Sequence, residues 1–107
     1  MLIDEYQSQA LKTAEYPSDK EMEYLLLGLS GEAGELNNKY KKVLRGDKEI
    51  DKEFRTEMAK ELGDVLWYVA LFAKAIGYNL DTVAQMNLSK LAARKEAGTI
   101  KGSGDNR

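Results

Sequence analysis

Two pairs of acidic residues, Glu32 with Glu35 and Glu61 with Asp64, carry the most evident chemistry in this sequence. Within each pair the second residue follows the first by three positions, so a helix would project both carboxylates from the same face. Apolar residues surround both pairs, and a carboxylate among apolar side chains is costly unless its charge is compensated. Four converging carboxylates would repel one another and would bind one or two hard divalent cations. The spacing therefore predicts a metal site and a metal-dependent reaction.

The composition narrows the chemistry that remains possible. The chain has 107 residues and a formal net charge of −2, and it contains neither Cys nor His. Thiol nucleophiles, disulfides, zinc sites of the Cys/His kind and a histidine base are therefore excluded. The charge balance does not indicate a basic surface for duplex nucleic acid or for an anionic membrane. Catalysis would have to use carboxylates, hydroxyl groups, Lys, Arg, Tyr or a metal.

The length and the N-terminus indicate one small cytoplasmic domain. A chain of 107 residues is long enough for a single core. Asp4 and Glu5 follow the first three residues directly, where a signal peptide would need a positive segment and a longer apolar run. The longest apolar run, residues 65–73, is too short to span a bilayer. We expect a cytoplasmic protein without a membrane partner.

Apolar residues recur in steps of three and four along most of the chain, which predicts an all-α fold. The expected helices run from Ile3 to Ala14, from a capping box at Ser18-Asp-Lys-Glu21 to Gly46, from Asp51 to Gly77, and from Asn79 to Gly98. A short polar connection joins the two long central helices, so they should pack as antiparallel neighbours in a four-helix bundle. Residues 1–98 would form the domain, and residues 99–107 a polar tail without periodicity.

Helical phase places both acidic pairs on the inward side of the central helices. Glu32 follows Leu29 by three positions and precedes Leu36 by four, and Glu61 follows Met58 by three. The two pairs should therefore face each other across the hairpin. Glycines cluster around them, at positions 28, 31, 34 and 63. Since glycine inside a helix costs about 1 kcal/mol relative to alanine, these positions predict the close approach of a backbone or a ligand.

The apolar band on the third expected helix is wider than one face. Tyr68, Leu71 and Ala75 extend it beyond the residues that face the hairpin partner. A four-helix unit of this size does not obviously cover such a band alone, so we expect a homo-oligomer, either a dimer or a tetramer.

The sequence motifs around the acidic pairs, and their order along the chain, resemble those of one family. Glu32-x-x-Glu35, a helical hairpin and then Glu61-x-x-Asp64 are similar to the signature of the MazG-like, all-α nucleoside triphosphate pyrophosphohydrolases. Gly-Glu-Ala-Gly-Glu-Leu, Glu-Leu-Gly-Asp-Val-Leu-Trp-Tyr and the downstream stretch from Lys90 to Arg94 also resemble that family, over roughly residues 20–98. The resemblance implies hydrolysis of a (deoxy)nucleoside triphosphate to the monophosphate and pyrophosphate, with Mg²⁺ or a substituting Mn²⁺, in a helical dimer or tetramer.

The resemblance also implies roles for individual residues. It assigns the metal to Glu32, Glu35, Glu61 and Asp64. In the absence of histidine a carboxylate would be the base for the attacking water, and either Glu35 or Glu61 fits that role.

Cationic and amide partners for the substrate are expected on one stripe of the last helix, at Asn87, Lys90 and Arg94, with the alternative that this stripe is a solvated basic face. Lys39 and Lys42 are further candidates for a phosphate, with the alternative that both are solvated. Tyr68 and Trp67 are candidates for the nucleotide, although Trp67 also suits a core or an interface. The first helix offers Tyr6, Gln7 and Gln9 toward the base.

Two other functions fit the same pattern. The enzyme could act on another nucleotide, such as phosphoribosyl-ATP, or the chain could be a non-catalytic helical oligomerisation module. The ending Lys101-Gly-Ser-Gly-Asp-Asn-Arg107 is either a disordered tail or a segment that closes over a phosphate or a neighbouring subunit. No P-loop or dinucleotide-binding glycine motif is present.

Overall fold

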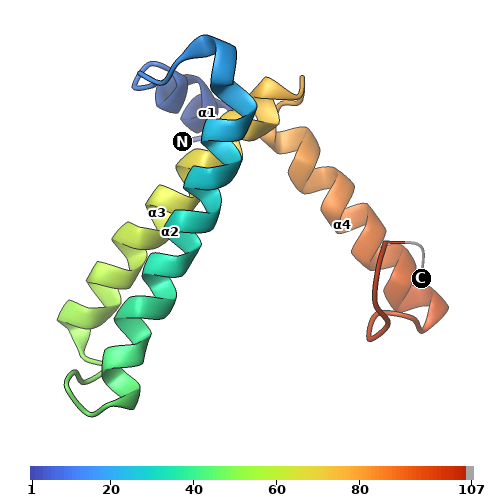
Figure 1. Ribbon diagram of the computed structural model, residues 1–107. Helices are drawn as coiled ribbons and strands as arrows, with labels where there is room; N and C mark the ends of the chain where they lie inside the picture. Colours follow the sequence, from blue (N-terminus) through green and yellow to red (C-terminus); the bar gives the residue numbers. More distant parts are fainter. Residues whose placement is uncertain (106–107) are drawn as a thin grey trace.

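A computed structural model describes residues 1–105 of the chain, and this part is helical without any strand. The elements in chain order are α1 (Ile3–Leu11), the short 3₁₀ helix η1 (Ser18–Lys20), α2 (Glu21–Leu44), α3 (Lys52–Ala75) and α4 (Leu80–Ala97). Figure 1 shows α2 and α3 side by side as a long antiparallel hairpin, with α1 across its upper end and α4 extending away. The all-α class and the central hairpin are therefore confirmed.

The ends of the helices follow the local sequence at most positions. Asp51 caps α3 by accepting a hydrogen bond from the Phe54 backbone N–H at 2.8 Å. Gly46, Gly77 and Gly98 follow α2, α3 and α4 with positive φ angles of 83°, 87° and 73°, which end the helices as predicted.

Two predicted helix boundaries are wrong. The capping box at Ser18 does not form, because residues 18–20 make a 3₁₀ turn and α2 starts after Lys20 without a side-chain cap. Glu21, the expected partner in that box, instead accepts a hydrogen bond from the Tyr16 hydroxyl at 3.1 Å. The first helix ends at Leu11 rather than Ala14, because the next three residues continue in tighter i to i+3 turns.

Gln7 fixes the start of α4 against α1 and α3. Its side-chain amide donates to the carbonyl oxygens of Ala70 at 2.9 Å and Tyr78 at 3.1 Å, and its oxygen accepts from the Leu80 backbone N–H at 3.0 Å. Asp4 accepts from the Asp81 N–H at 2.8 Å. The first turn of α4, whose own Asn79 makes no side-chain cap, is therefore capped by α1.

The core lies at the junction of α1, α2, α3 and the start of α4. Its buried apolar residues form two clusters, Ala10 with Leu25 and Leu71, and Ala70 with Ala73 and Leu80. Farther along, α4 contacts neither α2 nor the acidic side of the hairpin, so the predicted bundle is not closed within one chain. The radius of gyration is 16.7 Å, against about 13 Å for a compact domain of this length.

The open shape leaves large apolar side chains in contact with solvent. On α2, α3 and α4 the exposed ones include Leu26, Leu27, Leu62, Leu66, Met86 and Leu88. An exposed apolar area of this extent is typical of a surface that a second subunit covers. None of the described helices has the length and apolar content needed to cross a bilayer.

Candidate active site

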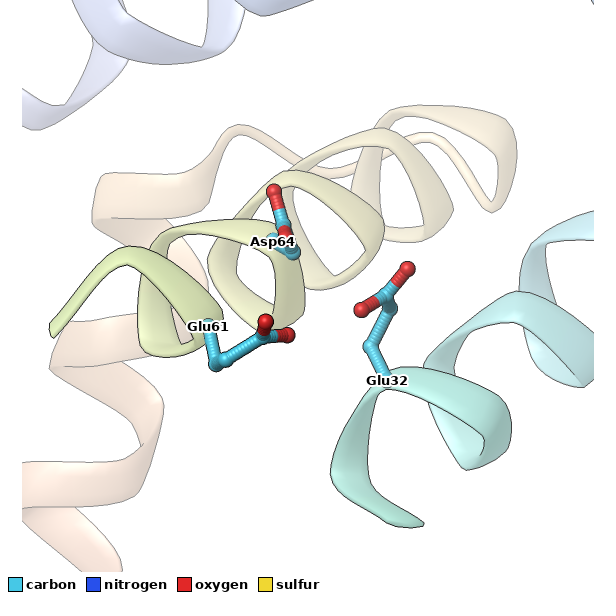
Figure 2. A group of neighbouring side chains, drawn as sticks. All are labelled: Glu32, Glu61 and Asp64. Carbon is cyan, nitrogen blue, oxygen red and sulfur yellow. The ribbon is translucent and has the colours of Figure 1, made fainter. Parts of the chain in front are cut away.

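Three of the four predicted carboxylates converge between α2 and α3. Each of Glu32, Glu61 and Asp64 places one carboxylate oxygen within 4.8 Å of an oxygen of the other two. Figure 2 shows Glu32 on α2 pointing across the hairpin toward Glu61 and Asp64 on α3. Glu61 and Asp64 share a face because they lie three residues apart on one helix. The structure therefore places these three side chains on the facing sides of α2 and α3, as the helical period predicted.

Glu35 belongs to the same open hollow but not to that tight group of three. The hollow has a volume of about 510 Å³ and is lined by Gly28, Gly31, Glu32, Glu35, Glu61 and Asp64. Glu35 is exposed, one turn farther along α2 than Glu32. The four residues thus line one hollow, with three close enough to share an ion and the fourth at its rim.

The charges in this hollow are only partly compensated. The Lys39 ammonium lies 3.5 Å from a Glu61 carboxylate oxygen. Burial raises the pKa of Glu32 above its ordinary value, and the negative charges of Asp64, Glu61 and Glu35 raise it further. A divalent cation would remove this repulsion, and an all-oxygen donor set suits a hard ion such as Mg²⁺ or Mn²⁺. The residues present therefore fit the predicted metal.

The raised pKa of Glu32 predicts a pH-dependent stability in the metal-free protein. Its proton is held more tightly in the folded state, so the stabilising contribution is complete below the ordinary glutamate pKa and is lost as pH rises through the raised value. The Glu32→Gln variant is neutral at every pH and should become the more stable protein toward neutrality. Thermal unfolding of both proteins with a chelator, from acidic to neutral pH, measures the difference. If the Tm of both proteins changes with pH in the same way, the predicted repulsion between Glu32 and the neighbouring carboxylates is contradicted.

The ring of Tyr68 packs directly beside Gly28, one of the residues that line the hollow, and Gly28 makes room for it. A Cβ atom built at Gly28 would overlap the Tyr68 ring, whereas one built at Gly31, Gly34 or Gly63 would meet nothing within 4 Å. Only one of the four glycines is therefore explained by packing within the chain. Burial raises the pKa of Tyr68, and the neighbouring Tyr24 and the charges of Glu32 and Asp64 add to the effect.

Tyr24 is a site neighbour that the sequence prediction missed. Its ring lies 6.5 Å from the ring of Tyr68 and stacks at 5.3 Å on Tyr16, measured between centroids. The signal was present in the sequence, because Tyr24 precedes Gly28 by one helical turn and so shares its face. An aromatic wall, consisting of Tyr16, Tyr24, Trp67 and Tyr68, thus stands beside the acidic hollow.

Trp67 is held in this wall by its own contacts. Its indole N–H donates to the Thr13 hydroxyl at 2.8 Å. Its ring meets those of Tyr68 and Tyr16 edge-on, at centroid distances of 4.9 and 6.4 Å. These contacts join the segment after α1 to α3 and give Trp67 a packing role. Contact with a nucleotide stays a prediction for both Trp67 and Tyr68.

The predicted contributions of α1 differ from residue to residue. Gln7 is buried and its amide is engaged by three backbone groups, so it positions α4. Burial raises the pKa of Tyr6, and the negative charge of Asp64 raises it further. Gln9 is exposed.

The remaining cationic candidates lie on two separate surfaces. Lys42 shares a hollow of about 320 Å³ with Lys39, Lys48, Phe54 and Glu57, farther along the hairpin. Asn87 and Lys90 line a hollow of about 410 Å³ on α4, together with Ile76, Tyr78, Val83 and Met86. Because α4 has no contact with α2, a single chain does not bring this stripe to the acidic hollow.

Arg94 is buried, unlike the other members of its stripe. Within the described part of the tail, its guanidinium donates hydrogen bonds to the Gly104 carbonyl and to the carboxylate of Asp105. Of the tail residues predicted to reach a phosphate, Lys101 is exposed and Arg107 lies outside the described residues.

Comparison with known proteins gives two matches over most of the chain. Residues 20–99 match the family model described as MazG nucleotide pyrophosphohydrolase domain. The Gene 37 protein of Mycobacterium phage L5 is 49% identical over 114 aligned positions, which cover 100% of both chains. No solved structure matches. The family match includes the acidic hollow, the aromatic residues of α3 and the whole of α4.

Proposed function

Since this chain belongs to the MazG nucleotide pyrophosphohydrolase family, we propose that it hydrolyses (deoxy)nucleoside triphosphates to monophosphate and pyrophosphate, using Mg²⁺. The observation that carries the proposal is the convergence of Glu32, Glu61 and Asp64 from two helices, within the span of the family match. A role in removing excess or non-standard nucleotides from the pool would follow from such an activity.

Glu32, Glu61 and Asp64 would hold the metal directly, with Glu35 at the rim of the hollow. When bound, Mg²⁺ supplies positive charge that polarises a phosphoryl oxygen and balances the charge of the leaving group. Mn²⁺ prefers similar oxygen ligands and would substitute.

The reaction implied by the family is attack of water on the α-phosphorus. The new bond joins the water oxygen to that phosphorus, the bond between the α-phosphorus and its bridging oxygen breaks, and pyrophosphate leaves. The chain has no histidine, so we assign the proton of the water to a carboxylate of the hollow. Glu35 suits this role better than Glu61, because Glu61 is already engaged by Lys39 and by the tight group of three.

A homodimer or homotetramer would complete the site. The open radius of gyration and the exposed leucines of the hairpin support association. Asn87 and Lys90 lie on a helix that leaves its own hairpin, so an assembly that brings α4 of one copy to the hairpin of another would supply their contacts to the phosphates.

Release of pyrophosphate from a panel of nucleotides tests the activity. The panel should include the standard and modified dNTPs, the NTPs and phosphoribosyl-ATP, each with and without Mg²⁺. We expect metal-dependent release from at least one triphosphate. Release from phosphoribosyl-ATP alone would show that the enzyme acts on that nucleotide and not on nucleoside triphosphates. If no nucleotide releases pyrophosphate, the remaining function is that of a non-catalytic helical oligomerisation module.

Mg²⁺ or Mn²⁺ alone should stabilise the folded protein. An ion that binds only the native state adds about 2.7 kcal/mol to the free energy of unfolding at a hundred times its Kd. Thermal unfolding over a titration of each metal measures the shift in Tm. The Asp64→Asn variant should show a smaller shift, because it removes a ligand from the group of three. Equal shifts in both proteins would place the ion elsewhere.

A further inference from the structure

The C-terminal tail folds back onto the end of α4 instead of leaving it. Gly98 reverses the chain with a φ of 73°, and the Thr99 N–H then donates to the Arg94 carbonyl at 2.8 Å. The Gly102 N–H donates to the Thr99 carbonyl at 3.0 Å, which tightens the next turn. Figure 1 shows the resulting loop lying beside the last turns of α4.

This loop brings Asp105 to two cations at once. One oxygen of its carboxylate lies 2.8 Å from the Lys90 ammonium and 2.9 Å from the terminal nitrogen Nη2 of Arg94. The same Arg94 nitrogen donates to the Gly104 carbonyl at 3.2 Å. The hydrogen bonds from Lys90 and Arg94 hold the pKa of Asp105 below its ordinary value, so the carboxylate is charged at neutral pH.

Lys90 and Arg94 are the two cations that the family resemblance implies as partners for the phosphates of a substrate. The Arg94 side chain is only 6% exposed, whereas that of its partner Asp105 is 79% exposed. Its Nε atom is buried and has no hydrogen-bond partner within residues 1–105. A phosphate group could bond Nε and Nη2 of the guanidinium together, which the observed carboxylate contact does not do.

We infer that Asp105 is an internal anion that occupies the Lys90–Arg94 pair, and that the phosphate groups of a nucleotide displace it. The inference rests on the proposed function for the identity of the displacing ligand. The tail then acts as an autoinhibitory latch, since the free cation pair exists only while Asp105 is detached. The apparent affinity for the phosphates is reduced by the fraction of molecules in which the latch is open.

The Asp105→Asn variant tests the latch. Asparagine has nearly the same shape but no charge, so the closed state weakens while the fold remains. Inorganic triphosphate, titrated calorimetrically into the full-length protein at saturating Mg²⁺, should bind about three- to tenfold more tightly to the variant. In nucleotide hydrolysis the variant should lower KM by a similar factor and leave kcat unchanged. Asp47→Asn is the matched control, because Asp47 forms an exposed pair with Arg45 at 2.9 Å away from both sites.

Unchanged or weaker binding of inorganic triphosphate by Asp105→Asn overturns the latch, and weaker binding would make Asp105 a residue that holds the cations in place. Lack of measurable binding to either protein also overturns it. The proposed function can fail separately. If the variant binds inorganic triphosphate more tightly but neither protein releases pyrophosphate from a nucleotide, the latch stands and the enzymatic activity does not.

Discussion

Glu61→Gln is expected to reduce kcat for pyrophosphate release by about a hundredfold to a thousandfold while the helical fold is kept. Glu61 is the member of the acidic group that also contacts Lys39, so its loss removes a metal ligand and leaves that ammonium unpaired beside the hollow. Glutamine has the same size, so the change acts through charge. Steady-state release of pyrophosphate and circular dichroism of the same preparations measure the two effects.

Glu57→Gln is the matched control for this variant. Glu57 lies one turn earlier on α3 and pairs with Lys48 at 4.0 Å, so it also sits opposite a lysine of the hairpin. It lies outside the group that can share an ion. Its replacement should leave kcat near the wild-type value. A Glu61→Gln enzyme as active as the Glu57→Gln enzyme would show that the carboxylates of the hollow do not perform the chemistry.

The sequence was sufficient to place the acidic group because two local rules act together there. Helical period decides which residues share a face, and a short connection forces antiparallel packing. These two rules are enough to bring together the carboxylates of Glu32, Glu61 and Asp64. Glu35 lies on the same face of α2 as Glu32 but one turn away from the group of three. Its distance from that group depends on where α2 and α3 cross, which the spacing of residues in the sequence does not determine.

The placement of α4 and of the tail could not be predicted in the same way. The apolar residues of α4 are spread around the helix, and only Leu80 and Arg94 of this helix are buried. Its direction depends on Gln7, whose three hydrogen bonds connect residues more than sixty positions apart. The contact of Asp105 with Lys90 likewise depends on a chain reversal at Gly98, which the sequence analysis treated only as the end of a helix.

Gly28→Ala should destabilise the protein, although alanine normally favours a helix over glycine. The helical preference would add about 0.5–1 kcal/mol to the free energy of unfolding. At this position, however, the new Cβ overlaps the aromatic ring of Tyr68, which is packed against the buried core. Overpacking of this kind costs about 1–3 kcal/mol, so the steric cost should exceed the gain. Chemical denaturation of both proteins measures the sign.

Two further variants separate the clash from the general effect of alanine. Gly63→Ala, in the interior of α3, meets nothing within 4 Å and should stabilise the fold by the helical term alone. In a Tyr68→Ala background the ring is absent, so the cost of Gly28→Ala should largely disappear in a double-mutant cycle. If Gly28→Ala stabilised the wild-type protein as much as Gly63→Ala does, Tyr68 could not occupy the space beside Gly28. The aromatic wall would then be open at that point, and the acidic hollow would extend farther toward α1.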